Sequence, residues 1–570
     1  MTAAEQPLYA ISRSKNQKAC IGKATVDLFV QLTLLCKIGV FLFGSYISGI
    51  HMKKLMLIME SKPTLAAMFG LITVMFAYTV INHQVFGEWD GVMHYFSGKH
   101  LIENGVYIGW ASHFWPPLQP LLLTLGDPFQ TGKIVSVVSG VITLISIYFI
   151  SDFYLKNPKK SIMVVLYVFS TTIFVETFTL VENHALETAF FMLGYLIFLH
   201  AREKNSVYFF VWCGGVVALA GLSRYTSYAL ALSLAMAIFF EKRSLNSFKN
   251  TFYFSMCFIL ISSLWWVPNY FLNGSPLHTW QYLNIGKEVF PAESNQFLWW
   301  HQKDIHSLTA LILSFPSEFL SNFKKNIFQG LFLIGSHLNS FEITSFIGLA
   351  LFSVFVAKNK IFKEFVCLNW PVFLVSVIFL LITSLAFNFT LALAPIIILV
   401  TTSIVVFTLN KSSRTFSVVV LFALINIAGS FVYMNTFLAK EKTDGAQLTD
   451  LNEINDILLK EAKSKAVLAS VNPARAYYSG IHWVMSPLGG KVSLCDFIDY
   501  NLPSKVVNYA PKVPVDSSDL KIDYLTLTSG MHKKHDFINE DLTLNTKSCH
   551  QYDFEILFSS SDTVLYKVTR

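Results

Sequence analysis

The sequence predicts a polytopic α-helical membrane protein that carries a small α/β domain at its C-terminal end. Three observations lead to this fold class. Hydrophobic residues make up 53% of the 570 residues, and charged residues only 14%. Soluble domains carry about 25% charged residues, so a soluble enzyme of this size is excluded. Charge is also unevenly spread, because residues 445–570 contain 13 basic and 15 acidic residues, whereas the much longer part before them contains 30 and 21.

The apolar runs predict the membrane body. A helix needs about 20 apolar residues to cross the hydrocarbon core of a bilayer. We expect eleven such spans, which lie at 64–81, 132–151, 161–181, 185–201, 206–223, 225–240, 251–267, 338–357, 366–385, 387–409 and 415–435.

The connecting segments predict the orientation. If Lys62 is cytoplasmic, the short inside segments hold sixteen Lys and Arg residues, and the longer outside segments hold few. Those outside are Lys99, Arg224, Lys287, Lys303, Lys324 and Lys325. The positive-inside rule then places the N-terminal side of the first span in the cytoplasm, and an odd number of spans places the C-terminal domain outside. We expect a multi-pass protein of a bacterial inner membrane, whose net charge of +7 reflects orientation and not nucleic-acid binding.

Composition divides the chain into three parts. Residues 1–61 are a poorly defined N-terminal extension, and the sequence leaves open whether residues 1–51 add a span. Residues 62–440 are the membrane body, with two long outer loops at 82–131 and 268–337 whose aromatic stretches suit the membrane interface. Residues 441–570 form the soluble extracytoplasmic domain. Its expected elements are a helix at 447–463 and strands at 466–470, 524–528 and 563–568.

Two of the seven cysteines, Cys495 and Cys549, lie in the C-terminal domain. An oxidising outer face would allow them to pair, but the sequence leaves open whether they lie close together.

The first outer loop opens with a group of ionisable residues. Glu88, Asp90 and His94 follow directly after the first span, where such residues are costly beside lipid and therefore candidates for function. A carboxylate at Asp90 would suit a general base acting on an acceptor hydroxyl. The alternative is a solvated loop acid, or the N-cap of a helix at 91–103.

A second group lies on the short outer turn between the third and fourth spans. It contains Glu176, Glu182, His184 and Glu187, with no basic residue among them. His184 and Glu187 are three residues apart and would share one helix face. With Asp90 they make a candidate site for a divalent metal, and the alternative is a polar cap on the fourth span.

Arg224 is an isolated cation on the outer side, between the fifth and sixth spans. A guanidinium is well suited to binding phosphate, and the alternative is that it extends to lipid headgroups. The chain contains no Walker-type loop and no CxxC or HExxH motif, so ATP-driven transport and zinc chemistry of those kinds are unsupported.

Four segments resemble motifs of the GT-C glycosyltransferases, the superfamily that includes protein O-mannosyltransferases and the transferases that add aminoarabinose or galacturonic acid to lipid A. They are Asp90-Gly-Val-Met-His-Tyr-Phe-Ser-Gly-Lys-His-Leu-Ile-Glu-Asn-Gly-Val-Tyr107, His113-Phe-Trp-Pro-Pro-Leu-Gln-Pro-Leu-Leu122, Ala185-Leu-Glu-Thr-Ala-Phe-Phe-Met-Leu193 and Gly221-Leu-Ser-Arg-Tyr-Thr226.

The resemblance implies that a hexosyl or pentosyl unit passes from a polyprenyl-phosphate carrier to a hydroxyl on the outer leaflet, with inversion. Asp90 would be the catalytic base. The residues that would bind the acceptor or the sugar are Glu88, Glu182, His184 and Glu187, and those that would bind the donor phosphate are Arg224 and His113. One departure is that the stretch 386–395, where many relatives carry an arginine, holds Asn388 and no cation.

The resemblance further implies a lipid, polysaccharide or protein acceptor. It requires no cofactor with certainty and leaves a divalent metal open. The competing interpretations are a transporter or flippase of lipid-linked sugars, an oligosaccharide polymerase or ligase, and a non-catalytic scaffold. A transporter is less favoured because no internal symmetry is visible, and the polar residues gather at the outer rim of the bundle.

Overall fold

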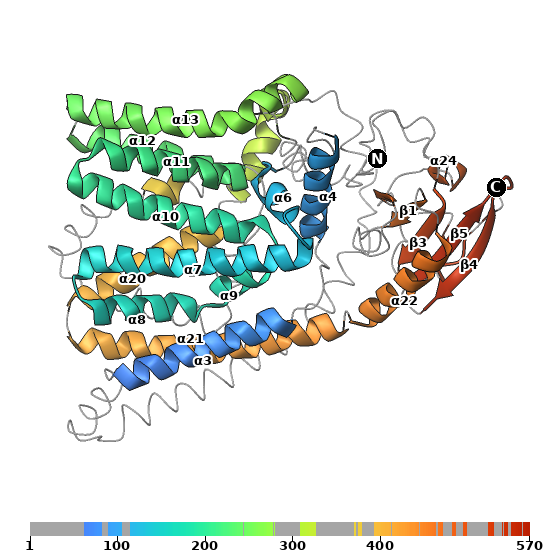
Figure 1. The fold of residues 1–570 in the computed structure, drawn as a ribbon, viewed down its shortest axis with the longest axis horizontal. Helices are drawn as coiled ribbons and strands as arrows, with labels where there is room; N and C mark the ends of the chain where they lie inside the picture. The colour runs from blue at the N-terminus through green and yellow to red at the C-terminus, as the bar shows by residue number, and fades with distance from the viewer. Residues whose placement is uncertain are drawn as a thin grey trace, which may run out of the picture.

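The computed structural model describes a helical bundle with a small sheet beyond one of its ends (Figure 1). We call that end the sheet end. The described residues are 62–82, 89–104, 115–242, 244–277, 279, 308–325, 370–371, 374–378, 393–411, 413–443, 445–462, 466–470, 482–485, 494–498, 522–528, 538–539, 541–544, 546, 549–560 and 563–570. The expected extension 1–61, the expected span at 338–357, and most of the span at 366–385 and of the second outer loop lie outside them.

Helices coincide with the expected apolar runs in the described part of the chain, apart from the run at 161–181. They are α3 (Lys62–Asn82), α7 (Pro128–Leu155), α10 (Asn183–Lys204), α11 (Val207–Ser223), α12 (Tyr228–Lys242), α13 (Leu245–Asn273), α20 (Ala394–Lys411) and α21 (Ser413–Thr443).

Several of these helices are apolar enough to cross a membrane. Within the described residues, three pass by length and composition: Pro128–Leu155, Asn183–Lys204 and Leu245–Phe271. A bent helix pair at 158–179 would add a fourth, and α11, α12, α20, α21 and α3 contain shorter apolar helices. The protein is therefore a polytopic helical membrane protein. The count of eleven spans stays a prediction.

The third expected span, at 161–181, is two helices and not one. α8 (Pro158–Phe169) and α9 (Thr172–Thr179) meet at an angle of 69°. At the break, the Ser170 hydroxyl donates to the Tyr167 carbonyl oxygen at 2.6 Å and the Thr171 hydroxyl to that of Val168 at 2.7 Å. Such local side-chain bonds compete with the helical pattern and explain why the helix breaks here.

Side chains at the helix ends set where the helices begin. The Asp127 carboxylate accepts from the Gln130 amide at 2.9 Å, and Pro128 occupies the first turn of α7, where its missing N–H costs nothing. The Asn157 side chain caps α8 in the same way, and Ser244 caps α13. α13 ends at Gly274, whose φ of 75° suits a residue without a side chain.

The core of the bundle lies among α7, α8, α10, α11, α12, α20 and α21, which contribute most of one large cluster of buried apolar residues. α11 packs closely on both α10 and α13. At Gly214 the backbone of α11 lies so near that of α13 that an added Cβ would collide with the Phe254 carbonyl oxygen. A small residue at this position therefore permits the close crossing.

Part of the first outer loop is described, and it lies at the sheet end. α4 (Trp89–Asn104) and the short α6 (Leu118–Leu123) stand beside the ends of α7 and α11 (Figure 1). A Cβ on Gly98 of α4 would collide with the Pro120 carbonyl oxygen, so the two helices are in close contact. Val92, Met93 and Phe96 of α4 belong to the same apolar cluster as residues of the C-terminal domain.

The C-terminal residues form a five-stranded sheet with helix α22 (Gly445–Glu461) leading into it from α21. Its strands are β1 (Val467–Ser470), β2 (His482–Met485), β3 (Tyr524–Thr528), β4 (Asp553–Ser559) and β5 (Thr563–Thr569). Their order is β2-β1-β3-β5-β4. β1 pairs in parallel with β2 and β3, while β5 runs antiparallel to β3 and β4. The expected helix and three expected strands are present, and β2 and β4 are additional.

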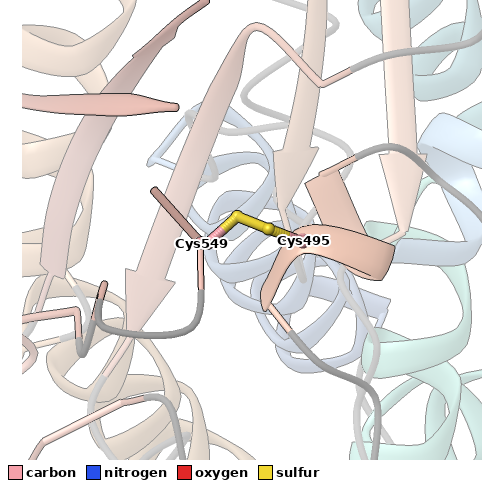
Figure 2. Close-up of a disulfide and its surroundings, with 2 residues drawn as sticks. All are labelled: Cys495 and Cys549. Carbon is pink, nitrogen blue, oxygen red and sulfur yellow. A yellow bond between two sulfur atoms is a disulfide. The ribbon is translucent and has the colours of Figure 1, made fainter. Parts of the chain in front are cut away.

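A disulfide joins Cys495 to Cys549 across this domain (Figure 2). Cys495 lies on the short helix α24 (Leu494–Ile498), and Cys549 lies just before β4. The sequence left this pairing open, since 54 residues separate the two cysteines.

Candidate functional site

Arg224 is the centre of a buried polar cluster at the sheet end. It follows α11, where its extended backbone (φ −152°) ends the helix. Its Nη1 donates to Asn183 Oδ1 at 2.8 Å and lies 3.1 Å from His184 Nε2, and its Nε lies 3.3 Å from a carboxylate oxygen of Glu187. Three side chains from the first two turns of α10 therefore hold one guanidinium. We call these four residues the Arg224 cluster.

Glu187 is buried completely within this cluster. Its Oε1 accepts from the Thr226 hydroxyl at 2.5 Å and from the Ser227 hydroxyl at 2.8 Å, while its Oε2 faces Arg224. A buried carboxylate is tolerated only when it is paired and hydrogen-bonded, and Glu187 meets both conditions. The turn formed by Arg224, Thr226 and Ser227 is thus tied to α10 at three points.

The start of α10 holds two further candidates from the sequence. Glu182 precedes the helix, and its carboxylate lies 3.4 Å from His184 Nε2. The Glu182 side chain is 16% exposed and that of Arg224 15%, so both reach the rim of the buried cluster. His184 and Glu187 share a helix face, as predicted, since both meet Arg224.

Asp90 lies in the first turn of α4, because that helix begins at Trp89. The expected helix at 91–103 is therefore present and starts slightly earlier, so Asp90 is not its N-cap. The described side chains of α4 begin one residue later, and the side chain of Asp90 lies outside them. Glu88 and His113 also lie outside the described residues. Their assigned roles, and that of Asp90, stay predictions.

His94, one turn after Asp90, connects α4 to the rest of the site. It is fully buried, and its ring packs on that of Trp115 with 4.5 Å between centroids. Burial, aided by the positive charge of Arg224, lowers the pKa of His94 to about 3. His94 is therefore neutral at physiological pH, and α4 lies within the electrostatic reach of the Arg224 cluster.

Sequence reasoning missed four polar residues of this region, namely Asn183, Thr226, Ser227 and Gln119. Asn183 also donates to the Ser223 carbonyl oxygen at 3.2 Å, which ties α10 to the end of α11. Thr226 and Ser227 lie two and three residues after Arg224, and this closeness in sequence to a predicted site residue could have identified them. Gln119 is fully buried in α6, between Pro117 and Pro120, and nothing in its local sequence marks it as functional.

The described residues contain no group of three His, Cys, Asp or Glu side chains that could hold a metal ion. His184 and Glu187 both face Arg224, so the guanidinium already neutralises the acidic side chain that was considered as a ligand. A site with Asp90, His184 and Glu187 stays a prediction, because the Asp90 side chain is not among those described.

A family model described as dolichyl-phosphate-mannose-protein mannosyltransferase matches residues 115–266. The matched segment contains every residue of the Arg224 cluster. The resemblance to GT-C glycosyltransferases is confirmed. No curated protein matches the chain. This part of the chain is thus similar to membrane glycosyltransferases that use lipid-linked sugars.

Solved structures similar to the chain include ArnT from Cupriavidus metallidurans bound to undecaprenyl phosphate, at 11% identity and a TM-score of 0.44, covering 89% of this chain and 98% of that chain. The same protein in the apo state is 12% identical with a TM-score of 0.44, and the match covers 88% of this chain and 97% of that chain. The Archaeoglobus fulgidus oligosaccharyltransferase tethered with an acceptor peptide is 13% identical with a TM-score of 0.45. That match covers 81% of this chain and 69% of that chain.

Proposed function

We propose that the protein transfers a sugar from a polyprenyl-phosphate carrier to a hydroxyl acceptor at the outer membrane face. The carrier phosphate binds at Arg224, and Asp90 is the general base. The observation that carries the proposal is the Arg224 cluster, a guanidinium fixed by three side chains at one end of a membrane bundle. The same proposal includes eleven spans, with the C-terminal domain outside.

Arg224 suits the phosphate of a lipid-linked donor for two reasons. Nη1 is held by Asn183 and His184, and Nε forms an ion pair with Glu187, whereas among the described residues neither Nε nor Nη2 donates a hydrogen bond. A guanidinium already held in place loses little conformational freedom when it binds an oxyanion. The end of a bundle is also where a carrier anchored in the bilayer presents its phosphate.

The chemistry is a displacement at the anomeric carbon. The acceptor oxygen forms a bond to that carbon while the bond to the phosphate oxygen breaks, and its electron pair leaves with the polyprenyl phosphate. The acceptor proton passes to the Asp90 carboxylate. The leaving phosphate gains a second negative charge, so a fixed cation at Arg224 stabilises the transition state more than the ground state. The anomeric configuration inverts.

Glu187 has a different role in this proposal from the acceptor-binding one that the resemblance implies. It is fully buried, and its contacts are Arg224, Thr226 and Ser227. These contacts support a positioning role for Glu187. Glu182, which reaches the rim, and the buried His184 beside it remain the proposed acceptor or sugar ligands, together with Glu88. His113 remains a second proposed phosphate ligand.

The test is a transfer assay on the purified full chain in lipid, with a mixed pool of radiolabelled polyprenyl-phosphate sugars and native membrane extract as acceptor. Asp90→Asn keeps the shape of the side chain and removes the base, so we expect kcat to fall by about 10²- to 10⁴-fold. Arg224→Lys keeps the charge and loses the planar fork, and we expect a loss of about 10²-fold.

The matched control is Lys156→Gln, which removes an exposed cation after α7 at the other end of the bundle and should leave the rate unchanged. Equal transfer by wild type and Asp90→Asn would eliminate Asp90 as the base. No transfer by any variant, with competent donors and acceptors, would favour a transporter, flippase or scaffold. Extension of one acceptor by many units would favour a polymerase.

A further inference from the structure

Two buried polar side chains near the Arg224 cluster have no hydrogen-bond partner in the part of the chain that the structure describes. His94 and Gln119 are both fully buried. Among the described residues, neither ring nitrogen of His94 and neither side-chain polar atom of Gln119 has a hydrogen-bond partner. A buried polar group left unpaired costs about 1–3 kcal/mol, so native proteins rarely keep four such atoms together without a ligand.

The two side chains belong to one interface, where α4 packs on α6. His94 stacks on Trp115, which immediately precedes α6. Gly98 lies one turn after His94 on the same face of α4, and it meets Pro120, the residue next to Gln119. His94 on α4 and Gln119 on α6 therefore lie on the two helices of one close contact, with the Trp115 indole against the imidazole.

This interface also adjoins the end of α11. Leu118, next to Gln119, packs against the cluster of Leu222 and Trp265, to which Tyr225 also belongs. Leu222 and Tyr225 flank Arg224 in the chain, so the start of α6 lies near the proposed phosphate-binding residue. The charge of Arg224 contributes to the lowered pKa of His94, which agrees with this placement.

The chemistry of the pair selects its ligand. A neutral imidazole offers one donor and one acceptor, and an amide offers two donors and one acceptor, which is what a set of sugar hydroxyls requires. Neither group carries a charge, so an ammonium or carboxylate on the sugar would lose hydration without gaining a counter-ion from this pair.

We propose that His94 and Gln119 bind the hydroxyl groups of an uncharged sugar ring next to the phosphate held by Arg224. The inference rests on the proposed transfer function and narrows its substrate to a neutral sugar. The ring belongs either to the donor or to the acceptor, because both would present the same hydroxyl chemistry at this place.

The experiment measures binding of three probes to the full chain in nanodiscs: undecaprenyl phosphate, its glucosyl ester and its aminoarabinosyl ester. For wild type we expect the glucosyl ester to bind at least tenfold tighter than undecaprenyl phosphate, and the aminoarabinosyl ester to show no such gain. Gln119→Met, which keeps the length of the side chain, should abolish the gain. Arg224→Lys should weaken all three probes alike.

A ring from the acceptor would give a different pattern. Gln119→Met would then leave the binding of all three probes unchanged and raise KM for an uncharged acceptor at least tenfold, which would equally support the inference. Unchanged probe binding with unchanged acceptor KM would overturn it, and so would a preference for the charged donor. Loss of the sugar preference in Gln119→Met, with no effect of Arg224→Lys, would contradict only the proposed phosphate site.

Thermal unfolding separates a binding role from a structural one. If Gln119 serves to bind a ligand, Gln119→Met removes a buried amide that has no described partner. The unliganded variant should then be as stable as wild type or more stable. If Gln119 has a structural role, Tm falls and the sugar preference stays, which contradicts the inference. The control is Asn426→Leu, at a buried amide on α21 whose Oδ1 is also unpaired, and it should not change the sugar preference.

Discussion

At the scale of single residues, the buried ion pair of Glu187 and Arg224 explains how a charged group is kept at the end of an apolar bundle. Two hydroxyls donate to Glu187 Oε1, an amide oxygen accepts from Arg224 Nη1, and an imidazole lies beside Nη1. Such pairs contribute little net stability, because desolvation offsets their attraction. Their value is positional, since removing one partner leaves the other charge uncompensated.

We expect Glu187→Gln to lower the free energy of unfolding by about 1–3 kcal/mol, because Arg224 loses its buried counter-charge while the hydroxyl bonds to the side-chain oxygen survive. Thermal unfolding followed by tryptophan fluorescence measures the change. Glu203→Gln is the matched control, because Glu203 lies on the same helix with a half-exposed side chain and should shift stability by less than about 0.5 kcal/mol.

The positioning role of Glu187 predicts coupling as well. In the Arg224→Lys background, Glu187→Gln should slow transfer far less than it does in wild type, because the guanidinium that it orients is already gone. Independent losses in the double variant would instead indicate that Glu187 contacts substrate.

The sequence could predict those contacts of this site that join residues close together in the chain, but not those that join distant segments. The shared face of His184 and Glu187 follows from helical spacing and was predicted. Their meeting with Arg224, about forty residues later, depends on how α10 packs against α11, which local spacing does not encode. Asn183 and Gln119 were missed because a single amide carries no periodic or charge signal.

At the scale of elements, the break between α8 and α9 is where the apolar pattern misled. Hydropathy over 161–181 is continuous, but Ser170 and Thr171 turn their hydroxyls onto carbonyls of the preceding turn. α21 also contacts the break, because the Ser430 hydroxyl donates to the Ser170 carbonyl oxygen at 2.6 Å and lies 3.3 Å from the Thr172 hydroxyl oxygen. A bend inside the bundle therefore needs a polar residue on the neighbouring helix.

We expect Ser430→Ala to lower the free energy of unfolding by about 1 kcal/mol, because the Ser170 carbonyl loses a buried partner at the break. Ser403→Ala on α20 is the control, since its hydroxyl donates to the Leu399 carbonyl oxygen of its own helix and, within the described ranges, to no neighbouring helix. Thermal unfolding in detergent compares the two. Equal effects would mean that the α21 contact does not support the bend.

At the scale of the whole molecule, charge density predicts a division into a membrane body and a soluble domain, and this division stays a prediction. The strands of the C-terminal sheet were harder to predict. β2 is only four residues long, and β4 is an edge strand with mostly exposed or half-exposed side chains, so neither has the apolar pattern of a buried strand. β1, β3 and β5 are largely buried, and their patterns predicted them correctly.

The disulfide between Cys495 and Cys549 bears on the orientation of the whole chain. Disulfides persist in oxidising compartments, so this pairing supports the proposed placement of the domain outside the cytoplasm. In intact cells, a membrane-impermeant maleimide should therefore label these two cysteines only after an external reductant is added. The control is the chain with Cys495→Ser and Cys549→Ser, which should show no such gain in labelling.

The opposite topology makes a contrasting prediction for the same experiment. With the domain in the cytoplasm, the two thiols would be reduced and shielded by the membrane, and labelling would appear only after the cells are opened, with or without reductant. An odd number of spans requires the first pattern if the segment before α3 is cytoplasmic. The labelling result therefore tests whether the number of spans is odd. The apolar runs predict eleven spans.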